Sequence, residues 1–460
     1  MAIFMTALVS ELHSHARSDP EYFLPRHTQV EAELRAVPTL PLRRLGRFDC
    51  SAFYPAATHL YSSDGIPFLR CVDIVKYPLI SPDQPFARIP ADFVDAHSTI
   101  RTLKAGDIVI SKVGSPCYAA LLSDDMPPSA MTRTVLGMSD IDESIVDPHY
   151  LIAFLRCKHG FEQLMREREL TIQYQLTLDR TRKVRVFLPT LPIQQMIGDI
   201  VRGYYRALRS SQDAYAAALQ LLELELGLTK LTFQKPVAYI AQFSEALNSR
   251  RIDADYFQTP FRQIDDHLDK YSTAKLHTLA DITKGIEVGS SAYKPEGYPF
   301  LRVSNIKETG IELGASDKYI SPALYAALQN YRPQVGELLL TKDGSPGVAM
   351  AVDQECNGII SGGVVRLKPK TDEIPIEYLA LAINSRACRM QVERECSGAL
   401  ILHWKPALIR KLRVPILPVP IMEKIAELVT EAKRARRKSD ELLEQAKTRV
   451  EQLIAEAVQP

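Results

Sequence analysis

The sequence repeats itself at a separation of about half its length. Residues 65–74 read GIPFLRCVDI and residues 297–306 read GYPFLRVSNI, so six of the ten letters are identical in place. An internal repeat constrains the fold strongly, because each copy is a structural unit that recurs along the chain. We therefore expect two versions of one module.

Further matches follow in the same order, and their offset drifts smoothly along the chain. DPEYF at 19–23 matches DADYF at 253–257 with an offset of 234, and the phrase above matches with an offset of 232. AGDIVISKVGSP at 105–116 matches VGELLLTKDGSP at 335–346 with an offset of 230, and VRVFLPTLPIQQMIGDIV at 184–201 matches LRVPILPVPIMEKIAELV at 412–429 with an offset of 228. Small loop deletions in a duplicated unit produce such a drift.

Each copy combines mixed α/β signals with one long helical segment. GDIVIS and GELLLT alternate as strands do and end in turns. The segments from Ile193 to about Leu226 and from Ile421 to about Ala457 lack internal proline and almost lack glycine. They predict helices of roughly 35 residues, about 50 Å long at ~1.5 Å per residue. The predicted divisions are a first module at 1–192, a helix and linker at 193–240, a second module at 241–420 and a helix at 421–460.

The two predicted helices carry matching heptad seams, which favour pairing as a coiled coil. The alternative is that each helix packs only on its own module, but a helix of ~50 Å exceeds a module with a radius of gyration near 15 Å. An antiparallel pair would give a pseudo-twofold arrangement and hold the modules farther apart than the ~34 Å of one DNA turn. The seam positions are Ile197, Val201, Tyr204, Leu208, Ser211, Tyr215, Ala218 and Leu222, and then Ile425, Val429, Ala432, Arg436, Ser439, Leu443, Ala446 and Val450.

The composition limits the kinds of partner and the compartment. The 460 residues are 46% hydrophobic and 24% charged with a net charge of +1, so bulk charge does not make this a coat for nucleic acid or membrane, although local basic patches are allowed. The seven cysteines are scattered without a CxxC pair, which argues against a disulfide framework or structural zinc. These features predict a cytoplasmic protein without a membrane span.

The order of these motifs resembles the specificity subunits of type I restriction-modification systems. The resemblance lies in RIDADYF, GYPFLRVSNI and VGELLLTKDGSPG, and in a proline followed by Gln-Gln or Met-Glu at the head of each long helix. It implies two target-recognition domains, each reading one half of a bipartite, asymmetric target in double-stranded DNA, and helices that serve as the spacer. The family's helix usually opens with Pro-x-Glu-Gln, whereas Gln194 and Gln195 or Met422 and Glu423 stand here.

The resemblance also implies partners and cofactors. Two DNA adenine methyltransferase subunits would bind the helices and use S-adenosylmethionine, and motor-nuclease subunits, where present, would use ATP and Mg²⁺. The specificity subunit itself would have no catalytic site and would bind no metal or other cofactor.

The sequence independently lacks the motifs of a self-contained enzyme. It has no GxxxxGK[ST] phosphate loop. The string closest to a methyltransferase Asp-Pro-Pro-aromatic motif is DMPPS at Asp125, which lacks the aromatic residue. Glu337 and Lys342 have the wrong spacing for a nuclease site. We therefore expect no catalysis by this chain alone.

A Lys-x-Gly-Ser-Pro turn ends a predicted strand in each copy. Lys112 with Ser115, and Lys342 with Ser345, place an ammonium, a hydroxyl and free backbone N–H groups where they can converge on a phosphate. The alternative is a plain hairpin turn with an exposed lysine.

Further basic residues recur in both copies. Arg70 and Arg302 lie inside the repeated phrase and either reach a DNA groove or, the favoured interpretation, pair with a carboxylate of the module. A cluster of three cations is retained 228 residues apart, which suggests one shared anionic partner such as the phosphate backbone, or else a charged strand edge that resists aggregation. The cluster consists of Arg182, Lys183 and Arg185, and then of Arg410, Lys411 and Arg413.

The segments before these clusters differ between the copies. The first contains Gln173, Tyr174 and Gln175, and the second contains His403 and Trp404. Amides that pair with adenine and rings that contact a thymine methyl are suited to reading bases, so these segments are candidate base readers. The run KRARRK at 433–438 is interpreted as a solvated helix face or a partner contact.

A coiled-coil adaptor with two protein-binding modules and no DNA specificity is the alternative function. The near-neutral charge favours it. An adaptor, however, has no evident need to repeat Lys-x-Gly-Ser-Pro turns and three-cation clusters at matched places.

Overall fold

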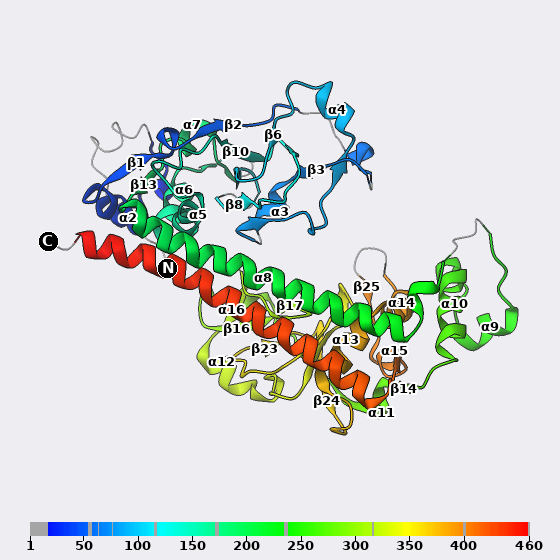
Figure 1. Cartoon of the computed structure of the whole chain (residues 1–460). Coiled ribbons are helices and arrows are strands. Elements are labelled where there is room, and N and C mark those ends of the chain that lie inside the picture. The colour runs from blue at the N-terminus through cyan, green and yellow to red at the C-terminus, as the bar shows by residue number, and fades with distance from the viewer. Residues whose placement is uncertain are drawn as a thin grey trace. The chain divides into compact units, whose positions relative to one another are not determined.

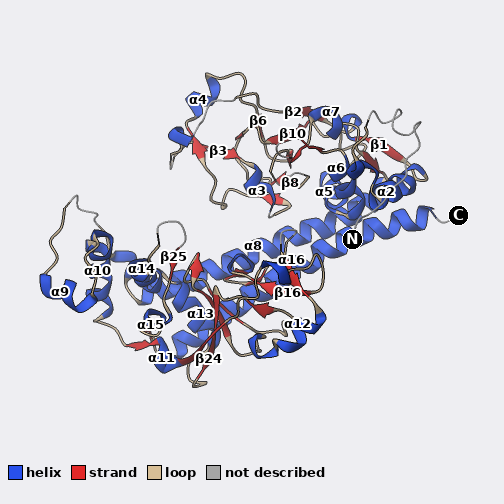
Figure 2. Ribbon diagram, turned by 180° about the vertical axis from the view of Figure 1, so that it is seen from behind, coloured by secondary structure: helices blue, strands red, loops and turns tan. Residues whose placement is uncertain are grey.

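The computed structural model describes residues 17–53, 58–62, 64–75, 77–114, 117–170, 174–233, 238–314, 317–398 and 402–458. The chain forms two compact units, and each unit combines one sequence repeat with part of both long helices. Unit 1 comprises residues 1–207 and 438–460, and unit 2 comprises residues 208–437. Figure 1 shows the course of the chain, and Figure 2 shows its helices and strands from behind. None of the helices in these ranges is long and apolar enough to span a membrane.

Unit 1 is built on a five-stranded sheet that is buried on both faces. The side chains of strand β7 (Ile108–Ser111) point alternately to the two faces of the sheet, so Ile108 and Ile110 join one core while Val109 joins another. The first core includes helix α5 (Pro148–Arg156), and the second includes β3, which belongs to a smaller sheet. The main sheet has the order β2 (Arg47–Asp49), β10 (Val135–Ser139), β7 (Ile108–Ser111), β8 (Ala119–Leu122), β4 (Leu79–Ile80), and the smaller sheet the order β5 (Arg88–Ile89), β3 (Ile66–Leu69), β9 (Ser129–Met131), β6 (Thr102–Leu103).

Unit 2 repeats this plan with fewer strands. In β20, Leu338 and Leu340 face the core that contains helix α13 (Ile376–Asn384), while Leu339 faces the smaller sheet. The parallel pair of the smaller sheet is retained, with Phe300 opposite Ile359. The main sheet has the order β15 (Ala280–Lys284), β24 (Val364–Pro369), β20 (Leu338–Thr341), β22 (Ala349–Ala351), and the smaller sheet the order β19 (Lys318–Ile320), β16 (Tyr298–Leu301), β23 (Ile359–Ile360).

The repeated phrase encodes the start of the smaller sheet in each unit. Gly65 and Gly297 precede β3 and β16 with φ values of 113° and 133°, which L side chains rarely adopt. A Cβ at Gly65 would lie 2.2 Å from the carbonyl oxygen of Ile89, and one at Gly297 would lie 2.3 Å from that of Ile320. The identical glycines are therefore required by close backbone packing.

Shorter helices flank the sheets, and Asp147 joins one of them to the long helix α8 (Leu191–Glu225). Its Oδ1 accepts hydrogen bonds from the N–H groups of His149 (2.8 Å) and Tyr150 (3.0 Å) as the N-cap of α5, and its Oδ2 accepts one from Arg202 (2.7 Å). Although burial opposes it, hydrogen bonds from His149 and Arg202 lower the pKa of Asp147 to about 2. The other flanking helices are α2 (Pro25–Arg35), α3 (Cys71–Val75), α4 (Ala91–Asp95), α6 (Lys158–Arg166) and α7 (Leu178–Thr181) in unit 1, and α9 (Phe243–Ser249), α10 (Thr259–Leu268), α11 (Leu276–Leu279), α12 (Pro322–Ala327), α14 (Arg386–Glu395) and α15 (Pro406–Ile409) in unit 2.

The two predicted long helices are confirmed as α8, with 35 residues, and α16 (Val419–Val458), with 40. In unit 1, Ile197 and Val201 of α8 share a core with Ala446 and Val450 of α16. In unit 2, Leu222 of α8 lies in the same core as Ile425 and Val429 of α16, along with residues of the module. Within each unit the early part of one helix meets the late part of the other, so the two segments run antiparallel.

The predicted seam is confirmed by burial. All of its positions are buried except Tyr215, Arg436 and Leu443, which are partly buried. The helix segments also pack on the modules, because the Asn384 side chain in unit 2 donates to the Tyr215 hydroxyl (3.0 Å). Pairing between helices and packing on a module therefore occur together rather than as alternatives.

The prediction of a solvated face for residues 433–438 is wrong at Lys433. This side chain is 2% exposed, and its ammonium donates to the carbonyl of Ala351 (2.9 Å) and pairs with Asp353 (3.2 Å). Arg436 pairs with Glu312 at 3.3 Å. These cations attach α16 to the module of unit 2.

Candidate nucleic-acid interface

In both units, the hydroxyl of the last residue of a core strand accepts a hydrogen bond from the backbone N–H of the residue seven positions later. In unit 1 the Ser111 Oγ accepts a hydrogen bond from the N–H of Tyr118 (3.0 Å). In unit 2 the Thr341 Oγ1 accepts from the N–H of Val348 (2.9 Å) and donates to the carbonyl of Ser345 (2.6 Å). In unit 2, the last residue of the core strand therefore holds both ends of the turn that follows it.

The turn pairs with the segment that differs between the copies. In unit 2, β21 (Asp343–Gly344) is antiparallel to β25 (Leu402–His403), and the N–H of Trp404 donates to the carbonyl of Lys342 (2.8 Å). In unit 1, Val113 forms a bridge with Gln175 of β12 (Tyr174–Gln175), and the N–H of Leu176 donates to the carbonyl of Lys112 (2.9 Å). Two regions predicted separately as DNA contacts thus lie side by side in each unit.

The structure contradicts the prediction of a free ammonium at Lys342. Its side chain is 11% exposed and pairs with the adjacent Asp343, whose other oxygen lies 2.8 Å from Nδ1 of His403. Although burial opposes it, hydrogen bonds from Lys342 and His403 lower the pKa of Asp343. Lys112 differs, since it is half-buried and its ammonium forms no ion pair with the described residues.

The predicted base readers differ in exposure. Trp404 is 1% exposed inside the core of unit 2, so the prediction that it contacts bases is wrong. The His403 side chain is 58% exposed. In unit 1 the Tyr174 hydroxyl donates to Glu21 (2.8 Å), which raises the pKa of Tyr174, and Gln175 is half-buried. Gln173 and Ser115 lie outside the described residues, and Ser345 is exposed.

Arg70 and Arg302 contact their own modules. The guanidinium of Arg70 binds both oxygens of Asp73, at 3.1 and 3.0 Å. Arg302 lies 4.0 Å from Asp317, and its N–H donates to Asn305 (2.9 Å). Both arginines thus lie beside a carboxylate of their own module, as in the favoured interpretation, and their assignment as DNA contacts stays a prediction.

The three-cation clusters do not form single patches. Arg185 donates to Thr39 Oγ1 (2.7 Å), and Arg413 pairs with Asp269 (2.8 Å). Arg185 begins β13 (Arg185–Phe187), which pairs with β1 (Thr39–Pro41), and Arg413 begins β26 (Arg413–Pro415), which pairs with β14 (Thr273–Lys275). Arg182 instead donates to the carbonyl of Phe48 (3.1 Å). The exposed members without an ion pair among the described residues are Lys183, Arg410 and Lys411.

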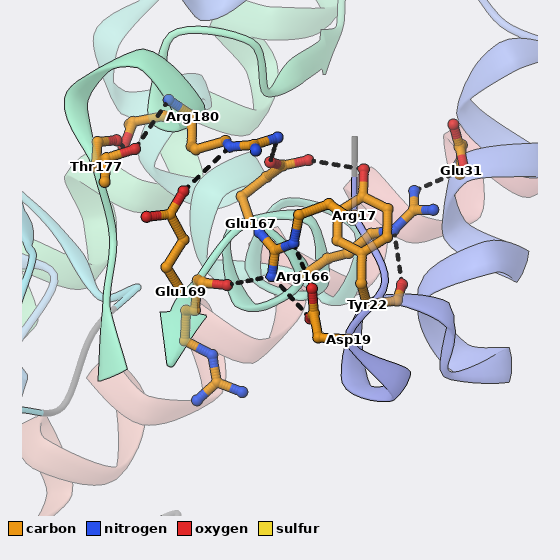
Figure 3. Close-up of polar contacts among 11 residues, drawn as sticks. Arg17, Asp19, Tyr22, Glu31, Arg166, Glu167, Glu169, Thr177 and Arg180 are labelled. Atoms are coloured by element: carbon orange, nitrogen blue, oxygen red, sulfur yellow. Dashed lines mark hydrogen bonds and ion pairs between the residues drawn. The ribbon is translucent and has the colours of Figure 1, made fainter. Parts of the chain in front are cut away.

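A group of residues that the sequence analysis did not assign to the site lies near the segment of unit 1 that contains Tyr174 and Gln175 (Figure 3). The ring of Tyr22 lies between two guanidinium groups, with Arg17 4.9 Å and Arg166 4.1 Å from its centroid. Arg17 is bound to both oxygens of Asp19 and donates to the carbonyl of Arg168 (2.7 Å). Burial, with the nearby Glu167 carboxylate, raises the pKa of Tyr22 to about 12.

Unit 2 contains the same arrangement, which we call the arginine clasp. Arg251 and Arg394 lie 4.9 and 4.3 Å from the centroid of Tyr256, and Arg251 binds both oxygens of Asp253. Arg394 pairs with Asp265 as Arg166 pairs with Glu31 in unit 1. The signal was present in the sequence, because RSDPEYF and RIDADYF share the arginine, aspartate and tyrosine at the same spacing.

The clasp of unit 1 reaches the candidate interface through β11 (Glu169–Leu170), the partner strand of β12. Arg180 pairs with Glu167 (3.5 Å) and Glu169 (3.4 Å), and Arg168 lies 4.1 Å from the ring of Tyr174. Hydrogen bonds from Arg17 to the carbonyl of Arg168 and from the Tyr174 hydroxyl to Glu21 connect the N-terminal segment of the module to this strand pair.

The interface is suited to binding rather than to reaction chemistry. Its side chains carry amide, imidazole, phenol and ammonium groups, which are hydrogen-bond partners of bases and phosphates. Within the described ranges, no group of three or more His, Cys, Asp and Glu residues is placed to hold a metal ion.

No protein-family model matches the sequence, and no curated protein matches it significantly. Among solved structures, the chain is similar to the type I restriction-modification S subunit from M. genitalium, with 12% identity, 92% of this chain and 96% of that one covered, and a TM-score of 0.40. The HsdS subunit from Thermoanaerobacter tengcongensis gives 15% identity, coverages of 90% and 96% and a TM-score of 0.31. A chain from a study of assembly and conformational transition of the type I R-M system has 14% identity and a TM-score of 0.30, with 92% of this chain and 98% of that one covered. At these TM-scores the similarity assigns no function by itself, so the function is argued from the residues.

Proposed function

We propose that this chain is the DNA-binding specificity subunit of a type I restriction-modification system. Each module recognises one half of a bipartite, asymmetric site in double-stranded DNA, and the chain directs two DNA adenine methyltransferase subunits to that site. The chain has no catalytic role and holds no cofactor. S-adenosylmethionine is used by the methyltransferase subunits, and ATP and Mg²⁺ by motor-nuclease subunits where these are present. The complex acts in the cytoplasm.

The observation that supports the proposal is that the two units share one backbone arrangement but carry different side chains on it. Both units place a Lys-x-Gly turn beside a short strand, but that strand presents Tyr174 and Gln175 in unit 1 and Leu402 and His403 in unit 2. A repeated frame docks on DNA in a repeated way, because backbone contacts fix the register of a protein on the duplex. Different side chains on that frame then read different bases.

The phosphate contacts of this proposal come from cations near the frame whose ammonium or guanidinium groups form no ion pair among the described residues. Lys112 follows β7 in unit 1, and Arg410 follows α15 in unit 2 without an ion pair among the described residues. Each phosphate that a cation neutralises contributes about 0.9 to the negative slope of log affinity against log salt. Binding to DNA should therefore weaken steeply between about 50 and 200 mM salt.

The test is to express the chain with its methyltransferase and map the methylated sites in cellular DNA. We expect one bipartite motif. Exchange of residues 241–420 for the same module of a relative should change one half of the motif and leave the other half unchanged. A change in both halves would refute the assignment of one module to each half-site, and scattered methylation would refute sequence-specific recognition.

An adaptor function is favoured by one observation, namely that Arg70 and Lys342 are paired with carboxylates of their own modules. An adaptor would bind random and specific DNA equally weakly. Measuring DNA affinity between about 50 and 200 mM salt separates the two functions, because the affinity of an adaptor for DNA would not fall steeply over this range.

A further inference from the structure

Each unit contains one cleft at the same place in the repeat, beside the arginine clasp. The cleft of unit 1 has a volume of about 270 Å³ and is lined by residues of α2, α6, α7 and β13. The cleft of unit 2 has a volume of about 150 Å³ and is lined by residues of α10, α14, α15 and β26. Both are smaller than the ~300–1,000 Å³ of sites for small-molecule ligands or cofactors. Their size therefore suits a single side chain.

The walls of the two clefts are held in the same way. The Gln163 side chain accepts from the N–H of Arg185 (3.0 Å) and donates to its carbonyl (2.9 Å), and Gln391 does the same with Arg413 at 3.0 and 2.9 Å. Arg166, from the clasp, donates to the carbonyl of Tyr22 (3.0 Å). Fixed walls lower the entropic cost of binding, since few groups have to become ordered when a ligand enters.

Each cleft has one cation that lacks a partner. Lys183 and Lys411 occupy equivalent positions in the repeat, both are exposed, and neither ammonium forms a hydrogen bond or ion pair with the described residues. The first cleft is lined by five basic and two acidic side chains and the second by three basic and two acidic ones, so both favour an anion. In the second cleft, the buried indole N–H of Trp404 also lacks an acceptor in the described part of the chain.

A carboxylate on a side chain fits these clefts better than a DNA phosphate does. A phosphate in a duplex is flanked by sugars on both sides and reaches exposed surfaces, whereas clefts of about 270 and 150 Å³ have room for one side chain. The second cleft also has apolar side chains in its wall, among them Phe261, Ile264 and Leu412. An aliphatic stem that ends in a carboxylate matches both properties. The cleft is retained in both copies of the repeat, whereas the base-reading segment is not. Two copies of the same ligand are therefore expected to bind, one in each cleft.

We propose that the two clefts are equivalent docking sites, each of which takes one carboxylate-bearing side chain from a protein subunit that binds this chain in two copies. The identity of that subunit as the DNA methyltransferase rests on the proposed function. The site itself rests on the duplicated cleft and its unpaired lysine.

The experiment measures assembly of the full chain with its methyltransferase subunit by native mass spectrometry, using Lys183→Glu, Lys411→Glu and the double variant. The controls are Lys104→Glu in unit 1 and Lys230→Glu in unit 2, which reverse an exposed charge outside the clefts. We expect two bound subunits for the unmodified chain and the controls. Each single variant should weaken one site tenfold or more and leave one bound subunit, and the double variant should bind none.

A second measurement identifies the ligand chemistry. Zero-length carbodiimide cross-linking joins a lysine amine to a carboxylate in contact with it, so Lys183 and Lys411 should be linked to the same acidic peptide of the partner. Two bound subunits on the double variant with unchanged affinity would overturn the proposal, as would cross-links to different peptides. A fall of about 0.9 per lysine in the salt slope of DNA binding, with assembly unchanged, would assign the lysines to phosphates and also overturn it. Normal assembly without methylation of a bipartite motif would refute the proposed function and leave the docking sites intact.

Discussion

Two arginines of unit 1 bind the same carboxylate at the same distance but differ in burial, which makes them a matched test of what holds the module together. A nitrogen of Arg166 and a nitrogen of Arg35 each lie 2.6 Å from an oxygen of Glu31. The Arg166 side chain is 8% exposed and the Arg35 side chain is 68% exposed. Distance alone therefore predicts equal contributions, while burial predicts very different ones.

Replacement of Arg166 by methionine keeps the aliphatic stem but removes three interactions. These are the pair with Glu31, the hydrogen bond to the Tyr22 carbonyl at 3.0 Å and the contact with the Tyr22 ring at 4.1 Å. Glu31 is 25% exposed and keeps its pair with Arg35, so the cost is that of the lost charged hydrogen bonds, roughly 1.5–3 kcal/mol of unfolding free energy. Replacement of Arg35 removes an exposed i,i+4 pair, which contributes roughly 0.3–0.5 kcal/mol.

The assay is urea unfolding followed by far-UV circular dichroism, with the fluorescence of Trp404 as a separate report on unit 2, since this is the chain's single tryptophan. Arg166→Met should shift the dichroism transition to lower urea, and Arg35→Met should leave it nearly in place. Equal destabilisation by the two variants would show that burial of the guanidinium is not the source of its contribution, and the reasoning would fail.

Three further predictions concern a buried aspartate, two buried tyrosines and the two long helices. Asp147 has a pKa of about 2, below the usual value of 3.8, so its ionised form contributes about 2 kcal/mol to the free energy of unfolding. This contribution is present above pH 4 and is lost as the pH falls through about 2. In acid titration, Asp147→Asn should therefore make the free energy of unfolding depend less on pH over this range. The buried hydroxyls of Tyr150 and Tyr378 donate to carbonyls at 2.6 and 2.8 Å, so replacement of either by phenylalanine should cost about 1–3 kcal/mol in urea unfolding, by leaving a carbonyl without its donor. Insertion of seven residues after both Ser211 and Ser439 keeps the heptad seam and adds about 10 Å to each helix, so methylation mapping should give the same half-sites with a gap up to about three base pairs wider, or weaker binding; an unchanged gap at full affinity would exclude the helices as the spacer.

The sequence by itself determined the features that depend on local periodicity. The duplication, the two long helices and their seam are all legible because helix formation and heptad spacing are properties of consecutive residues. The turn after each core strand was equally clear, since Gly114 and Gly344 adopt φ values of 86° and 68°, as glycine readily does in turns. The arginine clasp is visible in the sequence only as a repeated Arg-x-Asp motif, which does not by itself predict the contacts that the arginine makes.

The tertiary structure decided which charges are available to a partner. Lys112 and Lys342 are equivalent in the repeat, yet Lys342 is paired beside His403, which lies 60 residues from Asp343 in sequence. Trp404 was predicted from the sequence as a base reader, but it is 1% exposed in the core of unit 2. Whether a charge is solvated or paired depends on groups that folding brings from distant parts of the chain, and the energy of an ion pair depends on that burial more than on the residues that form it. The two clefts exist for the same reason, because each is formed by elements from both ends of a module.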